Sequence, residues 1–256
     1  VLTPHQAQVA QDFLADRARE RTHLVVYLSG AHAYGFASPD SDLDLKCVHV
    51  APTAALVGLS PPDDPTDRIE IVQGVELDYG SNELAPVLRG IIKGNGNYIE
   101  RLLGDLALAG DDRLLGEARL VVRPLLSRLV AKHYRGFATS QLAAFDGKPS
   151  AKRALYVLRT AATGRCLLDT GEVITDVAQL RDYVPAEIEE LLAIKRTGEK
   201  QELEASHAAA WRTRLADAVE GVSAAWPTSC LPEHPVPKAI DAASSWLIDV
   251  RRQFFA

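Results

Sequence analysis

The sequence is poor in the residues that build cross-linked or thiolate-metal proteins. Among its 256 residues it has three cysteines, Cys47, Cys166 and Cys230, and no methionine. The cysteines are odd in number and far apart, and they form no Cys-x-x-Cys pair or Cys/His spacing of the kind that binds zinc. We therefore expect buried or incidental thiols rather than a disulfide framework or a zinc centre.

Long apolar runs are missing too. No stretch approaches the roughly 20 apolar residues of a membrane-spanning helix, and residues 1–21 lack the pattern of a signal peptide. Acidic residues outnumber basic ones, 34 to 28, and the net charge of −6 argues against a broad nucleic-acid-coating surface but not against a local basic groove. With 47% hydrophobic residues the composition is that of a globular protein, which we expect to be cytoplasmic with no membrane partner.

Strand and helix patterns alternate in the first part of the chain. Runs rich in β-formers predict strands at 24–28 and 42–50, and two such runs around Gln73-Gly74 predict a hairpin at 68–79. Helical patterns are expected at 6–21, at 84–92 behind a Ser81 cap, and in an amphipathic segment at 98–108. A Pro- and Asp-rich surface loop is expected at 51–67.

The second part of the chain is almost wholly helical in pattern. Apolar residues recur three and four apart and predict helices over 120–144, 151–168, 185–195, 199–225 and 238–255. We therefore predict an α+β fold, with a mixed-sheet catalytic domain at 1–115 and a mostly helical domain at 116–256.

The residues best suited to catalysis gather in one stretch, 28–50. A strand pattern there ends in a turn containing Gly30 and Ala31, and a Gly/Ser/Pro-rich loop leads to Asp42 and Asp44 at the start of the next strand. Residues two apart on a strand share a face, so both carboxylates point to one place. Hard ions such as Mg²⁺ prefer oxygen ligands, and exposed backbone N–H groups at a helix start favour phosphate. The stretch predicts a site for metal and phosphate together.

A third carboxylate is expected from the second arm of the hairpin. Apolar residues there alternate with Glu76 and Asp78, so one face of the arm is acidic. Either residue can complete the cluster if both share that face.

Gly30-Ala31, a spacer, Ser41-Asp42-Leu43-Asp44 and a later acidic strand resemble the DNA polymerase β-like nucleotidyltransferase superfamily, in particular a bacterial and phage branch of it. The resemblance implies that three aspartates are catalytic and hold Mg²⁺ or Mn²⁺, namely Asp42, Asp44 and Asp78, and it favours Asp78 over Glu76. It also implies that the nucleotide is bound by Gly30, Ala31 and Ser41.

One residue departs from the family pattern. The family usually has serine after the glycine, where its hydroxyl meets phosphate, and this chain has Ala31. Losing such a contact weakens NTP binding by about 1–3 kcal/mol when its partner is left unpaired. Ala31 is thus the main argument for an alternative, a nucleotide-binding regulator or antitoxin-type partner protein with weak or no turnover.

Two basic-aromatic patterns stand out in the helical part. Lys152, Tyr156 and Arg159 are spaced three and four apart and share a helix face, either a nucleotide-binding face or a solvated one. The resemblance favours Lys152 and Arg159 as nucleotide-binding residues. A second pattern, at 132–135, is either a contact for the acceptor or ordinary helix surface.

The activity that the resemblance implies is transfer of an NMP from an NTP to an acceptor hydroxyl, with release of pyrophosphate. In two-metal sites one ion activates the attacking oxygen and the other stabilises the leaving oxygen. We expect the NTP between the two domains, since domain interfaces often hold such pockets. The acceptor is open: an RNA 3′ end suits related families, whereas a small molecule or a protein hydroxyl suits the acidic charge better.

Overall fold

The computed structural model describes residues 2–59, 61, 66–198 and 202–255, and within them the chain forms two compact units. The first unit comprises Val1–Gly30, Asp42–Leu126 and Pro235–Ala256, and the second comprises Ala31–Ser41 and Ser127–His234. This grouping differs from a single division after residue 115, which falls inside a helix of the first unit. The 1–115 and 116–256 domains remain a prediction.

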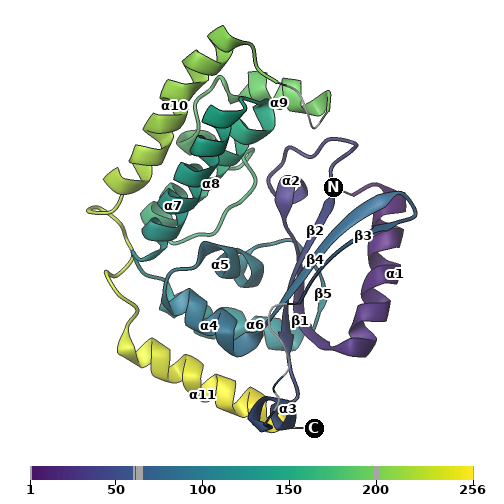
Figure 1. Ribbon diagram of the computed structural model, residues 1–256. Helices are drawn as coiled ribbons and strands as arrows, with labels where there is room; N and C mark the ends of the chain where they lie inside the picture. Colours follow the sequence, from purple (N-terminus) through teal and green to yellow (C-terminus); the bar gives the residue numbers. More distant parts are fainter. Residues whose placement is uncertain (1, 60, 62–65, 199–201, 256) are drawn as a thin grey trace. The chain divides into compact units, whose positions relative to one another are not determined.

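A five-stranded mixed sheet forms the centre of the first unit (Figure 1). Its order is β3-β4-β2-β1-β5, and the strands are β1 (Thr22–Leu28), β2 (Leu43–Val50), β3 (Thr66–Val72), β4 (Val75–Glu83) and β5 (Ala107–Gly110). The β2–β4 pair is parallel and the other neighbours are antiparallel. The helices of this unit are α1 (Pro4–Glu20), α2 (Gly30–Ala33, shared with the second unit), α3 (Thr53–Val57), α4 (Leu84–Ile92), α5 (Gly96–Leu103), α6 (Asp112–Val122) and α11 (Pro237–Gln253). The predicted α+β class is confirmed.

Alternation along β2 decides which way the sheet faces. Leu43 and Leu45 are fully buried in the cluster beneath α1, with Phe13 and Leu14 of that helix. The residues between them, Asp44 and Lys46, therefore point to the opposite face of the sheet. A one-residue slip would bury the charges and expose the leucines, so burial fixes the register. Figure 1 shows α1 along one face of the sheet and α4 and α5 across the other.

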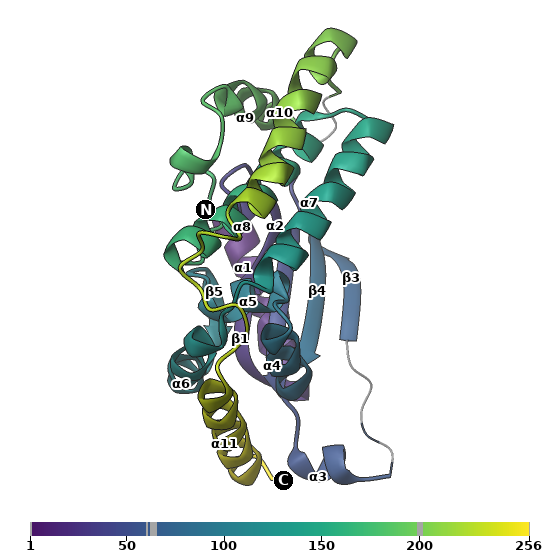
Figure 2. The same cartoon turned by 90° about the vertical axis from the view of Figure 1, so that its left-hand side faces the viewer.

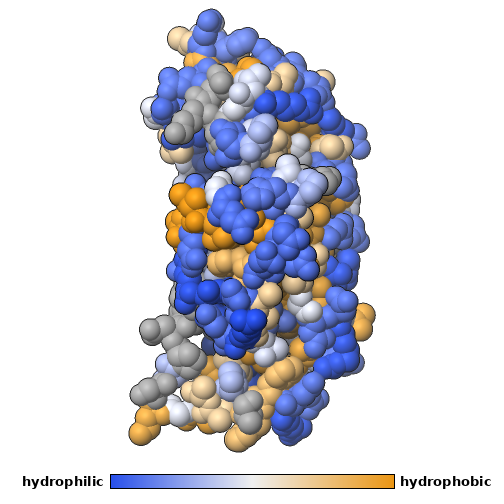
Figure 3. Space-filling model, turned by 90° about the vertical axis from the view of Figure 1, so that its right-hand side faces the viewer, coloured by the Kyte–Doolittle hydropathy of each residue, from blue (hydrophilic) through white to orange (hydrophobic). Residues whose placement is uncertain are grey.

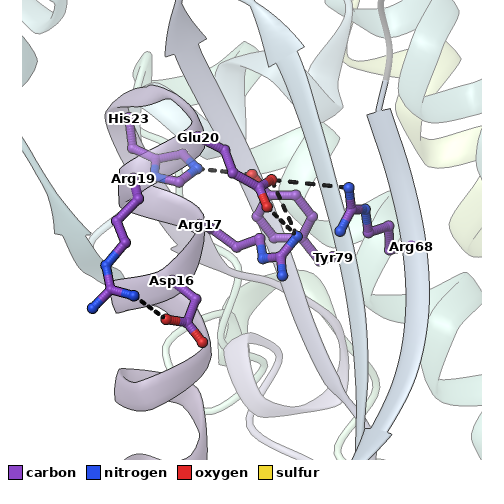
Figure 4. A network of polar contacts seen from close by, with 7 residues as sticks. All are labelled: Asp16, Arg17, Arg19, Glu20, His23, Arg68 and Tyr79. Carbon is purple, nitrogen blue, oxygen red and sulfur yellow. Dashed lines mark hydrogen bonds and ion pairs between the residues drawn. The ribbon is translucent and has the colours of Figure 1, made fainter.

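A polar network joins α1 to the sheet (Figure 4). The His23 ring nitrogen Nε2 and the Tyr79 hydroxyl are 2.8 Å apart, and both residues are buried. At the end of α1, Glu20 lies 2.9 Å from Arg17 and 3.9 Å from Arg68 of β3. The exposed part of this network contributes little to stability, whereas the buried His23–Tyr79 bond ties β1 to β4.

The edge strand β3 carries hydrophobic side chains into solvent. Ile69 and Ile71 are 72% and 74% exposed, and they lie opposite Asp78 and Glu76 of β4. Figure 3 looks onto the side that carries α1 and the β3–β4 hairpin, where hydrophobic surface interrupts a largely hydrophilic face. The sheet is thus bordered by apolar surface at its β3 edge.

The last helix, α11, returns to the first unit. Arg251 forms an ion pair of 2.6 Å with Glu83 at the end of β4, and Trp246 donates a hydrogen bond to Glu117 of α6. Figure 2 shows α11 beneath α6 and α4. The two ends of the sequence therefore belong to the same compact unit.

The second unit is helical. Its helices are α7 (Val130–Gly147), α8 (Ala151–Thr170), α9 (Ile188–Arg196) and α10 (Ala205–Ala224), with a 3₁₀ turn at Arg181–Tyr183. Helix α8 is its core, because α7, α9 and α10 all pack on it. Residues 31–41, the loop between β1 and β2, belong to this unit as well.

Several predicted boundaries were wrong, because turns interrupt the patterns. The helix expected over 120–144 is broken by a 3₁₀ turn at Arg123–Leu125, where Pro124 cannot continue α6. The segment expected over 98–108 ends its helix at Gly104 and then enters β5, and the helix cap is Glu83 rather than Ser81, which lies in β4. The loop expected over 51–67 contains α3, and its residues 60 and 62–65 lie outside the described part of the chain, as do 199–201 of the predicted fourth helix. No helix in the described ranges is long and apolar enough to cross a membrane.

Candidate active site

Three carboxylates converge on the face of the sheet opposite α1, in the first unit. Asp44 of β2 and Asp78 of β4 are direct partners in the parallel pair, and Asp42 precedes Asp44 by two residues. Burial, the Asp42 charge and the nearby Asp78 raise the pKa of Asp44 to about 7, although Lys46 opposes the shift. The structure thus brings the three predicted aspartates together in one strongly negative place.

Gly30 lies directly against this cluster. Its φ of +65° belongs to the left-handed region, and a Cβ at this position would lie 1.8 Å from Asp44 Oδ2. Only glycine allows the backbone to come so close to the carboxylate. The one-turn helix α2 begins at Gly30, and the first N–H groups of a helix have no partner within it. The predicted phosphate turn therefore lies beside the predicted carboxylates.

Lys46 is a member of the cluster that sequence reasoning missed. Its Nζ lies 2.6 Å from Asp78 Oδ1, and both side chains are partly buried. Lys46 follows Asp44 by two residues on β2, so the alternation that placed Asp42 and Asp44 also placed Lys46 on their face. The spacing was therefore a usable signal.

Glu76 is placed differently from Asp78. Its side chain is exposed, whereas Asp78 is partly buried and directly opposite Asp44. The charges that raise the pKa of Asp44 include those of Asp42 and Asp78. Of the two alternatives, the geometry favours Asp78 as the third carboxylate.

The carboxylate oxygens of this cluster are the type of ligand that a hard divalent cation prefers. Burial and the neighbouring Asp42 charge disfavour the ionised form of Asp44. A bound cation would offset both effects, because it would favour the ionised carboxylates as oxygen ligands. In the part of the chain that the structure describes, no three acidic, histidine or cysteine side chains are already arranged as a metal-binding group. In this structure the third carboxylate, Asp78, is paired with Lys46.

The predicted nucleotide-binding face of α8 packs on the loop between β1 and β2, within the second unit. The Tyr156 ring makes edge-to-face contacts with Tyr34 and Phe36, at centroid distances of 5.7 and 5.5 Å. The Arg159 guanidinium lies 3.6 Å from the Tyr34 ring centroid and is buried, and the Lys152 ammonium lies 5.9 Å from the Tyr156 ring. This helix face is therefore not an ordinary solvated surface, because it organises the loop that leads from Gly30 to Asp42.

Ala31 and Ser41 lie at the two ends of this loop and are both buried. Ser41 Oγ accepts a hydrogen bond of 2.9 Å from Ser38 N, and Ser38 Oγ accepts one of 2.5 Å from the buried ammonium of Lys195 on α9. Lys195 had no signal in the sequence, since its partner is far away in the chain. In this structure the Ser41 hydroxyl holds the loop in shape.

The chain is similar to one protein family and to individual proteins of two organisms. A family model, that of the RNA repair pathway DNA polymerase beta family (RlaP), matches residues 7–249. An uncharacterized protein of Methanocaldococcus jannaschii is 25% identical over 160 residues, which are 62% of this chain and 65% of that protein. A nucleotidyltransferase-like protein from Exiguobacterium sibiricum aligns over 96% of this chain and 80% of its own, at 10% identity and a TM-score of 0.36.

Proposed function

Because the chain belongs to the RNA repair pathway DNA polymerase beta family, we propose that it is a Mg²⁺-dependent nucleotidyltransferase that adds an NMP to a hydroxyl of an RNA acceptor. The family supports nucleotidyl transfer in general, and its link to an RNA repair pathway supports an RNA acceptor. One observation carries the proposal: Asp42, Asp44 and Asp78 converge beside the glycine turn at Gly30. This is the combination that metal-assisted attack on a triphosphate requires.

Each carboxylate has its own role in this proposal. Asp42 and Asp44 hold the cation, which when bound neutralises phosphate charge and increases the nucleophilicity of the acceptor oxygen. Asp78 lies beside the attacking hydroxyl and, once released by Lys46, accepts its proton or joins the ligands. Lys46 holds Asp78 in place until then.

The nucleotide is expected to contact the turn and the loop that follows it. Backbone N–H groups from Gly30 onward receive the phosphates, as they do at other helix starts. Lys152 and Tyr156 supply a cation and a ring, whereas buried Arg159 supports the loop through Tyr34. Mn²⁺ is expected to substitute for Mg²⁺ because it accepts the same oxygen ligands.

The second candidate is a nucleotide-binding regulator with weak or no turnover. Ala31 favours it, because the residue after the glycine offers no hydroxyl to a phosphate. Binding of Mg²⁺·NTP without transfer to any acceptor would establish this candidate instead.

The test is transfer of label from α-³²P NTPs to single-stranded RNA ending in a 3′ hydroxyl, with Mg²⁺. We expect transfer by the wild type and a loss of at least about 100-fold in Asp42→Ala, Asp44→Ala and Asp78→Asn, because each substitution removes charge from the reacting centre. The matched control is Glu76→Gln, two residues from Asp78, which should retain activity.

Three outcomes contradict the proposal or its assignments. Full activity in Asp42→Ala and Asp44→Ala would refute the site. Loss of label transfer in Glu76→Gln but not in Asp78→Asn would show that Glu76, and not Asp78, is the third carboxylate. Transfer to a small molecule or a protein, with none to RNA, would refute the acceptor class while leaving nucleotidyl transfer in place.

A further inference from the structure

A groove on the second unit is not used by the site described above. It has a volume of about 700 Å³ and lies where α7 meets the C-terminal end of α10. Its lining includes Lys132, Arg135 and Gly136 of α7, with Ser223 and Trp226 on the other side. Figures 1 and 2 both show α7 and α10 side by side.

The α7 wall of the groove is positively charged. Lys132, Arg135 and Gly136 share a face because they are three and four residues apart. Lys132 and Arg135 are both exposed, and a Cβ added at Gly136 would meet nothing within 4 Å, so the helix surface between the cations is open. Tyr134 of the same run is instead buried beneath Gly164, so the predicted patch at 132–135 contributes its cations but not its tyrosine.

The opposite wall supplies an aromatic ring and a hydroxyl. Trp226 is half-buried in the turn after α10, where its backbone N–H donates to Ser223 O. The Ser223 Oγ atom is shielded from solvent and makes no hydrogen bond within the described part of the chain. A groove that combines two cations and an indole ring has the composition of a site for a phosphate and its base.

Resting on the proposed RNA acceptor, we propose that this groove holds a nucleotide of single-stranded RNA. Lys132 and Arg135 contact the phosphates of the strand, and a base stacks on Trp226. Charge complementarity favours this occupant, because a local cationic groove stands out in a chain of net charge −6. The groove takes no part in the transfer step, so it adds affinity for the acceptor.

Glu220 lies beside the groove, and its substitution is expected to change RNA affinity in the opposite direction from substitution of the cations. Arg135 lies 3.5 Å from Glu220 of α10, and both side chains are largely exposed. A phosphate in the groove would replace Glu220 as the partner of Arg135. Removing the Glu220 charge should therefore strengthen RNA binding, whereas removing either cation should weaken it.

The experiment measures binding of a fluorescein-labelled single-stranded RNA of about 12 nucleotides, within the range that such sites cover. Anisotropy is recorded with the full chain in EDTA and without NTP, over a range of KCl concentrations. We expect Lys132→Gln and Arg135→Gln each to lower the slope of log affinity against log salt by about 0.7. Trp226→Leu should weaken binding about 5-fold or more and Trp226→Phe should restore most of it, while Glu220→Gln should tighten binding.

The matched control is Arg212→Gln, which removes an exposed cation of α10 that pairs with Asp146 away from the groove. Thermal melting of each variant confirms folding. Unchanged affinity and salt slope in the groove variants would overturn the proposal, as would equal binding of duplex RNA. Displacement of the RNA by polyglutamate at comparable charge concentration would also overturn it, since the groove would then fit an acidic protein.

The two proposals fail in different ways. If the groove variants bind RNA normally while Asp44→Ala abolishes label transfer, the groove inference is wrong and the proposed function stands. If the groove variants lose RNA binding while Asp42→Ala and Asp44→Ala transfer label normally, the active-site assignment is wrong and the groove stands.

Discussion

At the scale of single residues, the backbone conformation of Gly30 controls how closely the chain approaches the Asp44 carboxylate. A Gly30→Ala substitution forces a side chain into a left-handed conformation and places it 1.8 Å from Asp44 Oδ2. We expect label transfer to fall by at least about 10-fold and unfolding to need about 1–3 kcal/mol less free energy, because both backbone and carboxylate must move.

The matched control for Gly30 is Gly116→Ala in α6. A Cβ there meets nothing within 4 Å, and alanine favours a helix interior by up to about 1 kcal/mol over glycine. Label transfer and urea-induced unfolding measure both variants. Equal effects of the two substitutions would show that the contact with Asp44 is unimportant.

The Asp44 carboxyl gives the metal-free protein a pH dependence of known sign. Its pKa is raised from 3.8 to about 7 in the fold, so folding favours the protonated form. This stabilising contribution is complete below pH 3.8 and is lost as the pH rises through 7. In EDTA, Asp44→Asn should therefore gain stability over the wild type between pH 5 and 8, by on the order of 5 °C in Tm.

Mg²⁺ should reverse that order, because it binds the charged carboxylates of the wild type and stabilises the folded state. Thermal melts at pH 5, 6.5 and 8, with EDTA or with Mg²⁺, measure both effects. A constant difference between wild type and Asp44→Asn across this range would contradict the assigned titration.

Residue-level prediction was most successful where alternation applied. Asp42 and Asp44 were placed on one face from strand periodicity, whereas the choice of Asp78 over Glu76 came from the family resemblance. The register of β2 and β4 places Asp78 directly opposite Asp44. Lys195 could not be found in this way, since its bond to Ser38 spans 157 residues and only the folded chain creates it. Local periodicity shows which residues share a face of a strand or helix, whereas contacts between distant residues are visible only in the folded chain.

At the scale of elements, the buried bond between His23 of β1 and Tyr79 of β4 predicts acid sensitivity. Burial, followed by the charges of Arg21 and His49, lowers the pKa of His23 from 6.5 to about 4. Folding thus favours neutral His23, and this stability is present above pH 6.5 and lost as the pH falls toward 4. His23→Gln cannot be protonated, so its free energy of unfolding should fall less over that interval, by at most about 3 kcal/mol.

Urea unfolding at pH 6.5, 5 and 4 measures the difference. His234→Gln is the control, because that imidazole is 70% exposed. If His23→Gln and the wild type lose stability in parallel, protonation of His23 does not drive acid unfolding.

Prediction of elements failed at turns and at edges. Pro124 and Gly104 interrupt helical patterns that otherwise continue, and neither interruption changes the spacing of the apolar residues around it. The edge strand β5 (Ala107–Gly110) has no β-branched residue, and pairing with β1 rather than intrinsic preference makes it a strand. The strand depends on pairing with β1, which lies far from it in the sequence, so the local sequence could not predict it.

At the scale of the whole molecule, each compact unit is built from segments that are not contiguous in the sequence. A change from mixed to helical pattern near residue 115 suggested one division, but the compact first unit takes α11 from the far end of the chain, and the second takes the loop 31–41 from near the beginning. Periodicity identifies a helix without saying which unit it joins. The contacts of Arg251 and Trp246 supply that information only in the folded chain.

The attachment of α11 can be tested with two neighbouring arginines. Arg251 pairs at 2.6 Å with Glu83, and their side chains are only 16% and 5% exposed, so Arg251→Gln removes a buried ion pair. Such losses cost about 3–5 kcal/mol. Arg252 pairs with Asp249 at the surface, and Arg252→Gln should change stability by less than about 1 kcal/mol. Urea unfolding should separate the two variants, and Arg251→Gln with Glu83→Gln should recover part of the loss, because the second change removes the buried carboxylate charge. Equal stability of both single variants would show that the ion pair does not anchor α11 to the sheet.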